Sequence, residues 1–144
     1  MDKDNLIKQL SDAVKTGAHY NFITLRSATS LRPGEYALLS YIWDHKDREG
    51  GVKISDISRF MRVTPPTVTP IVGRMEKQGY INRVTSKQDR RVANLFLTPK
   101  GKEALDECNE KRSEQFSNLI EILGEDDTKE LIRILKKMSP KDFI

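Results

Sequence analysis

The stretch VTSKQDRRVANLFLT, Val84 to Thr98, holds the residues whose types and spacing suggest chemistry most directly. Its middle, Ser86 to Arg91, contains three cations and one carboxylate but no apolar side chain. Apolar and β-branched residues flank this segment on both sides, which predicts two strands joined by a polar tip. Such a polar tip is not expected to be part of a hydrophobic core. Clustered lysine and arginine side chains are instead suited to meeting the phosphates of a polyanion.

The formal net charge of +4 conceals an uneven distribution of charge along the 144 residues. Between Gly51 and Lys100 there are ten lysines and arginines against three acidic residues. The rest of the chain holds fifteen basic and eighteen acidic residues. A basic middle between slightly acidic ends favours contact with nucleic acid, although a solvated basic face would give the same charge count. The pattern of predicted elements therefore has to decide between the two.

Residues that could support catalysis or bind a metal are sparse. The two histidines, His19 and His45, fall in different predicted helices, and Cys108 is the single cysteine. They form neither a nucleophile motif nor a metal-ligand cluster, so we expect no catalytic residue, no metal and no cofactor. One cysteine also excludes an internal disulfide. We interpret Cys108 as a buried, inert thiol rather than a redox switch.

The segments that must position the polar tip predict a helix-turn-helix followed by a two-stranded ribbon. A short helix is expected over Ser55–Met61, with Ile57 and Phe60 facing inward. Thr64 then caps a second helix, which starts with a proline and runs over Pro65–Gln78. The two helices are separated by about four residues, which is helix-turn-helix spacing.

The second of these helices has one side suited to a DNA major groove. Its buried side is predicted at Val68, Ile71, Val72 and Met75. The opposite side carries small hydroxyls, a proline ring and cations, at Thr67, Thr69, Pro70, Arg74 and Lys77. Small groups can approach base edges while cations meet phosphates, although each could also be an ordinary surface residue. The ribbon tip would then reach a minor groove, whose negative potential attracts arginine.

Further helices are predicted on both sides of this region from the spacing of apolar residues. They cover residues 4 to 27, 33 to about 50, 99 to about 123 and 127 to about 138. The chain has no run of about 18 apolar residues that could cross a membrane, and its N-terminus lacks the apolar stretch of a signal peptide. We therefore expect a cytoplasmic protein without membrane contact.

The segment TPPTVTPIVGRMEKQGYINRVTSKQDRRVANLFLTPKGKEAL, from Thr64 to Leu105, resembles the MarR family of winged helix-turn-helix regulators. The most specific points are RMEKQGYINR, the D-x-R spacing of Asp89 and Arg91, and LTPKG. The resemblance extends over nearly the whole chain and implies a mostly α-helical fold with a small β-wing. It implies one domain over 1–144, with a winged helix-turn-helix part at 33–98 and dimerisation helices at 1–30 and 99–144.

The resemblance also implies a homodimer that binds double-stranded DNA sequence-specifically at a pseudo-palindromic operator, mostly as a repressor. By carry-over, the recognition helix is Pro65–Gln78 and the wing arginine is Arg91. With the exposed helix side and the basic tip described above, the expected DNA-binding residues are Thr64, Pro65, Pro66, Thr67, Thr69, Pro70, Arg74, Lys87, Arg90 and Arg91. For Lys87 and Arg90, plain solubility stays an equal alternative. Asp89 is implied to orient an arginine at the wing base, either Arg83 or Arg91. Pro70 departs from the family pattern, and we expect it to kink its helix.

Many members of the family release DNA when a small phenolic or lipophilic effector binds. The implied effector pocket lies near His19, Tyr20, Phe22, Tyr36 and Trp43, most of which could equally serve the core. The alternative function is a winged helix that binds another protein. Such a module should show aromatic or aliphatic anchors on its exposed helix, whereas this one shows hydroxyls and cations, so DNA is favoured.

Overall fold

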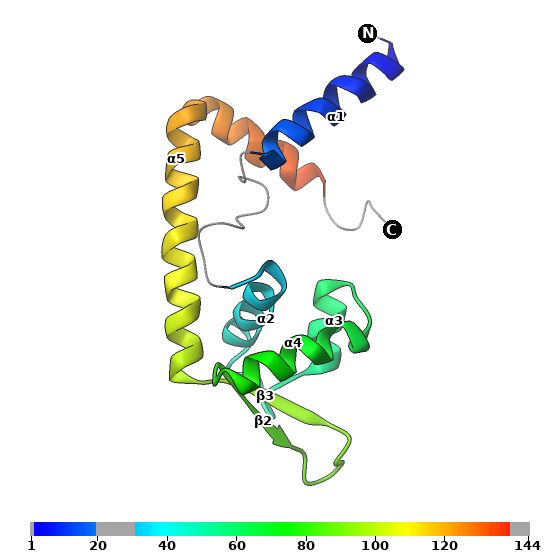
Figure 1. Cartoon of the computed structure of the whole chain (residues 1–144), viewed down its shortest axis with the longest axis vertical. Helices are drawn as coiled ribbons and strands as arrows, with labels where there is room; N and C mark the ends of the chain where they lie inside the picture. Colours follow the sequence, from blue (N-terminus) through cyan, green and yellow to red (C-terminus); the bar gives the residue numbers. More distant parts are fainter. Residues whose placement is uncertain (1, 20–30, 139–144) are drawn as a thin grey trace. The chain divides into compact units, whose positions relative to one another are not determined.

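The structure is a computed structural model that describes residues 2–19 and 31–138 (Figure 1). Five helices and three strands follow in the order α1 (Lys3–His19), α2 (Pro33–Asp44), β1 (Val52–Lys53), α3 (Ile54–Met61), α4 (Pro65–Lys77), β2 (Ile81–Thr85), β3 (Ala93–Leu97) and α5 (Pro99–Lys137). The predicted class, mostly α-helical with a small β-wing, is confirmed. None of the helices in the described ranges is long and apolar enough to cross a bilayer.

The chain forms two compact units, which we call the winged unit (26–110) and the terminal unit (1–25 and 111–144). The boundary falls inside α5, so that the first turns of this helix belong to the winged unit. The winged unit holds a three-stranded antiparallel sheet in the order β1-β3-β2. Ile81 pairs with Leu97 and Thr85 with Ala93, so β2 and β3 form a hairpin whose tip is the wing (Figure 1).

A single hydrophobic core of the winged unit fixes which side of α4 stays in solvent. Every helix and strand of this unit contributes to the core, with Leu38, Leu39, Ile42, Val52, Ile57, Val68, Val72, Met75, Ile81, Leu95 and Leu105 almost completely buried. Cys108 is buried against the same cluster, as expected for an inert thiol. Because α4 buries Val68, Val72 and Met75, which recur at helical spacing, its opposite side is left exposed.

The helix α3 corrects two expectations. It begins at Ile54 rather than Ser55, because the Asp56 carboxylate accepts a hydrogen bond from the backbone N–H of Lys53 at 3.0 Å and so satisfies the start of the helix. Phe60 does not face inward, since 56% of its surface is exposed. The inward stripe of this short helix is centred between Ile57 and Met61, and Phe60 lies at its edge.

One expectation about helix length was also wrong, and the kink expected at Pro70 stays a prediction. Helix α2 ends at Asp44 rather than near residue 50, and turns follow it. Helix α4 continues through Pro70 as one element, although Pro70 offers no amide hydrogen to the Pro66 carbonyl. Pro70 lies inside α4, and its exposed position leaves room for the ring on the solvent side. We conclude that the proline removes a hydrogen bond without interrupting the helix.

A set of hydrogen bonds joins the end of α4 to the start of α5. The Thr98 hydroxyl donates to the Gly79 carbonyl at 2.6 Å and accepts from the Gly101 amide at 3.0 Å, which caps α5. Lys100 Nζ donates to the Gln78 carbonyl at 2.8 Å, at the negative end of the α4 dipole. A Cβ added to Gly101 would lie 2.1 Å from the Tyr80 carbonyl oxygen, so only glycine allows this close approach.

The terminal unit contains α1 and the part of α5 from residue 111 onward. Gly124, with φ of 79°, breaks α5 into two helical stretches, in agreement with the two separate helices predicted over 99 to about 123 and 127 to about 138. Many apolar side chains of the unit are exposed: Leu6, Ile7, Leu10, Val14, Phe116, Ile120, Ile122, Ile132, Ile134, Leu135 and Met138. Exposed apolar residues at this density mark an interaction surface.

Candidate nucleic-acid interface

The exposed side of α4 carries the residues that the sequence singled out. Thr64, Pro65, Pro66, Thr67, Thr69, Pro70, Arg74 and Lys77 are all exposed. Thr64 occupies the N-cap position, but its hydroxyl lies 3.1 Å from the Thr67 hydroxyl rather than bonding a backbone amide. The Thr69 hydroxyl donates to the Pro65 carbonyl at 3.0 Å. Each oxygen keeps a lone pair, with which it could accept from the amino group of adenine or cytosine.

Arg74 is held by a buried carboxylate on another helix. Its Nε lies 3.7 Å from Oε2 of Glu35, a residue of α2 that is only 6% exposed. The other oxygen, Oε1, accepts a hydrogen bond from the Arg32 amide at 2.9 Å. The pair keeps the Arg74 side chain, 45% of which is exposed, against the body of the unit. The Glu35 carboxylate therefore partly balances the charge of the Arg74 guanidinium, the other side of which is exposed.

The wing holds a second arginine in a fixed geometry. Arg91 donates to the Asp89 carboxylate from Nε at 3.1 Å and from Nη2 at 3.2 Å, and its backbone N–H donates at 3.0 Å. Arg83 pairs instead with Glu76 of α4, with 3.6 Å between Nε and Oε2. Of the two arginines that Asp89 was expected to orient, the structure therefore pairs it with Arg91.

The hydrogen bonds from the Arg91 side chain, and then from its amide, hold the pKa of the Asp89 carboxyl below its usual value. A carboxyl with a lowered pKa stays ionised at neutral pH, so the pair persists there and weakens only when acid protonates Asp89. Asp89 and Arg91 together then bring no net charge to the wing.

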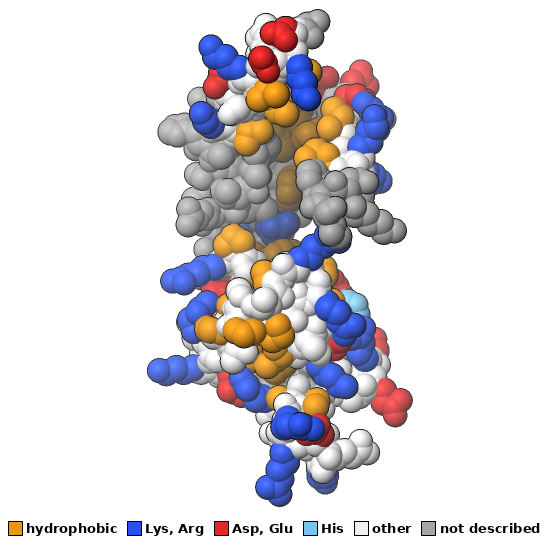
Figure 2. Space-filling view, turned by 90° about the vertical axis from the view of Figure 1, so that its right-hand side faces the viewer, with side chains coloured by type: hydrophobic (Ala, Val, Ile, Leu, Met, Phe, Trp, Pro, Cys, Tyr) orange, Lys and Arg blue, Asp and Glu red, His pale blue; other side chains and the backbone are white. Residues whose placement is uncertain are grey.

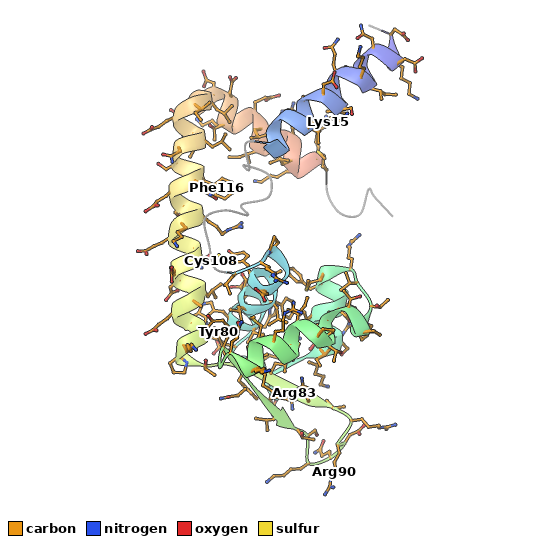
Figure 3. All side chains as sticks on the ribbon, in the orientation of Figure 1. Lys15, Tyr80, Arg83, Arg90, Cys108 and Phe116 are labelled. Atoms are coloured by element: carbon orange, nitrogen blue, oxygen red, sulfur yellow. The ribbon has the colours of Figure 1, made fainter. Side chains whose placement is uncertain are left out.

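The net charge of the wing tip comes from its two other cations. Lys87 and Arg90 are exposed, and within the described part of the chain no carboxylate pairs with either. Backbone bonds close the tip beneath them, from the Ser86 amide to the Val92 carbonyl at 2.8 Å and from the Val92 amide to the Asp89 carbonyl at 3.0 Å. Arg90 projects from the end of the hairpin (Figure 3), and basic side chains gather at this end of the winged unit (Figure 2).

The residues expected to form an effector pocket are only partly described. Tyr20 and Phe22 lie outside the described residues, and so does the side chain of His19, which ends α1. The Tyr36 hydroxyl donates to the Asn109 side chain at 2.7 Å. Two ammonium groups lie over the Trp43 ring, Lys46 Nζ at 4.3 Å and Lys102 Nζ at 4.1 Å from its centroid. Tyr36 and Trp43 thus have structural contacts of their own within the winged unit.

Sequence reasoning did not identify the carboxylates that hold the arginines of this interface. Glu35 and Glu76 pair with Arg74 and Arg83, which lie 39 and 7 residues further along the chain. A signal existed for Glu35 alone, because an acidic residue in the first turn after Pro33 is typical of a helix start. Its pairing with Arg74 depends on how α2 packs against α4, which spacing does not reveal.

Comparison with known proteins points to one family. The model of the MarR family matches residues 31–93 of this chain, from the start of α2 to the wing. The HTH-type transcriptional repressor MdtR of Bacillus subtilis (strain 168) is 29% identical over 109 residues, which cover 76% of this chain and 68% of that protein.

Solved structures share the fold. The YusO protein from Bacillus subtilis superposes with a TM-score of 0.72 at 22% identity, over 96% of this chain and 98% of that one. The S. aureus MepR–DNA complex gives a TM-score of 0.64 at 22% identity, over 96% of both chains.

Proposed function

We propose that this chain, which belongs to the MarR family of winged helix-turn-helix regulators, is a cytoplasmic homodimeric repressor of a pseudo-palindromic DNA operator. At a coarser level, the chain is a DNA-binding transcriptional regulator. Helix α4 reads bases in the major groove, and the wing reaches the minor groove beside it. A small lipophilic or phenolic effector relieves repression.

One observation carries the proposal: α4 and the wing offer DNA a matched set of small polar groups and cations. The exposed side of α4 carries hydroxyls and no aromatic or long aliphatic anchor, which disfavours a protein partner on this side. Lys87 and Arg90 supply charge that no carboxylate of the described residues balances at the wing tip, and Asp89 holds Arg91 through two side-chain hydrogen bonds. An arginine that is already held loses less side-chain entropy when it meets DNA.

The homodimer is supported by the terminal unit. Its exposed apolar residues occur on α1 and on both stretches of α5 beyond residue 111. Burying such surfaces against a second copy would remove apolar area from water at about 25 cal/mol per Å². The repressor MdtR supports repression as the mode of action.

The salt dependence of DNA affinity tests this proposal. We expect the wild-type protein to bind a fragment of its own upstream region more tightly than a shuffled fragment of equal length. The logarithm of the association constant should fall linearly with the logarithm of salt concentration, by about 0.9 for each phosphate neutralised. Equal affinity for the two fragments would contradict sequence-specific recognition, and affinity independent of salt would contradict DNA binding by the basic wing.

A further inference from the structure

The start of α4 offers DNA few backbone hydrogen-bond donors. Pro65 and Pro66 occupy the first two positions of the helix and carry no backbone N–H. The next amide, that of Thr67, already donates to the Thr64 carbonyl at 2.9 Å. Helix N-termini usually bind phosphate through free backbone amides. The start of α4 is therefore poorly equipped to hold the DNA backbone, and its proline rings occupy the place of the missing donors.

The hydroxyl hydrogens of the same turns are mostly used within the helix. Thr69 donates its hydroxyl hydrogen to the Pro65 carbonyl at 3.0 Å. The hydroxyls of Thr64 and Thr67 lie 3.1 Å apart, so that one donates to the other. At most one hydroxyl hydrogen of these three threonines is then left for a base. Guanine N7 and O6, adenine N7 and thymine O4 are all acceptors in the major groove, so these turns have little with which to bind them.

The exposed side of these turns is instead short and apolar. Pro66 and Pro70 lie about one turn apart on the same side of α4, and both are exposed. Thr69 lies next to them, and because its hydroxyl hydrogen is taken, it can offer a base only a lone pair or its methyl group. Gly73 continues this side, and a Cβ built there would meet nothing within 4 Å. From Pro66 to Gly73, no long side chain on this side holds the helix away from base edges.

We infer that the first two turns of α4 recognise thymine by its C5-methyl group, with Pro66 and Pro70 as the specificity-determining residues. Thymine is the base that presents a methyl group in the major groove, and apolar side chains are suited to contact it. The cations of α4, Arg74 and Lys77, lie further along the helix and leave its first turns to this contact. This reading of thymine rests on the proposed function, because it specifies what α4 recognises when the chain binds its operator.

Uracil substitution in the DNA tests the inference without a change in the protein. The full chain first selects its preferred sequence from a pool of duplexes with a randomised centre. The selected duplex is then prepared once with thymine and once with uracil, which lacks only the methyl group. We expect the uracil duplex to bind about tenfold or more weakly, because each of the two half-sites loses at least one apolar contact. Competition measured by fluorescence anisotropy gives the ratio of the two affinities.

Two proline variants connect this ratio to α4. Pro66→Ala and Pro70→Ala each remove most of a ring while keeping a residue that favours helix, and each should lower the thymine-to-uracil ratio by about threefold or more. Pro99→Ala is the matched control, because Pro99 is an exposed proline at the first position of another helix, α5. The control should keep the full ratio. The thermal midpoint of each variant verifies that it folds.

The possible failures separate this inference from the proposed function. Equal affinity for the thymine and uracil duplexes, with the selected sequence still preferred over a shuffled one, overturns the inference and leaves the proposed function intact. If no sequence is selected from the pool, both are overturned. An undiminished ratio in either Pro66→Ala or Pro70→Ala, or an equal decrease in Pro99→Ala, also overturns the inference, because the methyl group would then be recognised elsewhere.

Discussion

The arginines of the winged unit deliver less free charge than their number suggests. Carboxylates lie within 4.0 Å of Arg48, Arg59, Arg74, Arg83 and Arg91. Each pair fixes a guanidinium in place and balances much of its charge. The exposed pairs among them, such as Arg91 with Asp89, add little to stability, typically about 0–1 kcal/mol, so positioning is the better explanation for those. We therefore expect the long-range attraction of DNA to come from cations that have no carboxylate partner in the described part of the chain, which at the wing tip are Lys87 and Arg90.

Arg90→Ala should therefore alter the salt dependence of DNA binding. If Arg90 neutralises one phosphate in each half-site, the slope of log affinity against log salt should become shallower by about 0.9 for each phosphate that the variant no longer neutralises. Anisotropy titrations at several salt concentrations measure this slope. Arg133→Ala, which removes an exposed charge from the terminal unit, is the control and should leave the slope as it was. An Arg90→Ala protein with the wild-type slope would assign the residue to solubility alone.

Asp89→Asn separates charge from geometry at the wing. The change makes the wing more positive, and attraction alone would then strengthen DNA binding. It also removes the carboxylate that Arg91 grips with two side-chain nitrogens. If orientation of Arg91 matters more, the affinity should fall by about 1–3 kcal/mol, the scale of one good contact. Affinity measured at low salt, where attraction is strongest, decides the matter, and tighter binding by Asp89→Asn would refute the positioning role.

At the scale of elements, the junction of α4 and α5 is the most constrained part of the winged unit. Gly101→Ala would drive a Cβ to 2.1 Å from the Tyr80 carbonyl oxygen and 2.9 Å from Leu97. Since backbone must move, we expect a loss of about 1–3 kcal/mol or more in the free energy of unfolding, measured with urea. The matched change is Gly73→Ala in α4, where a Cβ meets nothing within 4 Å. It should be neutral or stabilise by up to about 1 kcal/mol, and similar losses in both variants would exclude the steric explanation.

Pro70→Ala tests how α4 tolerates its internal proline. The substitution restores an amide hydrogen that can reach the Pro66 carbonyl and removes the ring from an exposed position. Alanine is favoured over proline inside helices by about 3 kcal/mol in host peptides, so we expect a gain of about 1–3 kcal/mol in the free energy of unfolding. Urea denaturation measures the gain. A less stable variant would mean that the proline ring makes a packing contact that the substitution removes.

The order and type of the elements in the winged unit followed from local signals. Pro33, Pro65 and Pro99 each mark a helix start, and the alternation around the charged tip marks the hairpin. Local signals gave wrong or missing predictions where packing against other elements determined which side chains are buried or paired. Phe60 looked apolar and inward, but the narrow stripe of a short helix excludes it. The partners of Arg74 and Arg83 depend on how helices and strands pack, so the sequence offered no means of choosing them.

At the scale of the whole molecule, the exposed apolar surface of the terminal unit predicts a stable homodimer. Sedimentation velocity at micromolar concentration should show one species with twice the chain mass of 16.5 kDa. Replacing Leu10 and Leu135, each more than half exposed in the described chain, with aspartate should shift the species toward monomer, because burying unpaired charge is costly. If the wild-type protein sediments as a folded monomer, the homodimer is contradicted, and with it the reason for expecting a symmetric operator.

Footprinting on DNA that includes the region upstream of its own coding sequence tests the central claim most directly. A dimer that places one α4 and one wing on each half-site should protect two inverted half-sites, with centres about one helical turn or roughly 34–36 Å apart. Pro65–Lys77 and the wing are the only parts this prediction requires to touch the DNA. Two protected half-sites related by a dyad are the predicted result. Protection without dyad symmetry, or no protection at concentrations at which the protein is dimeric, would contradict it.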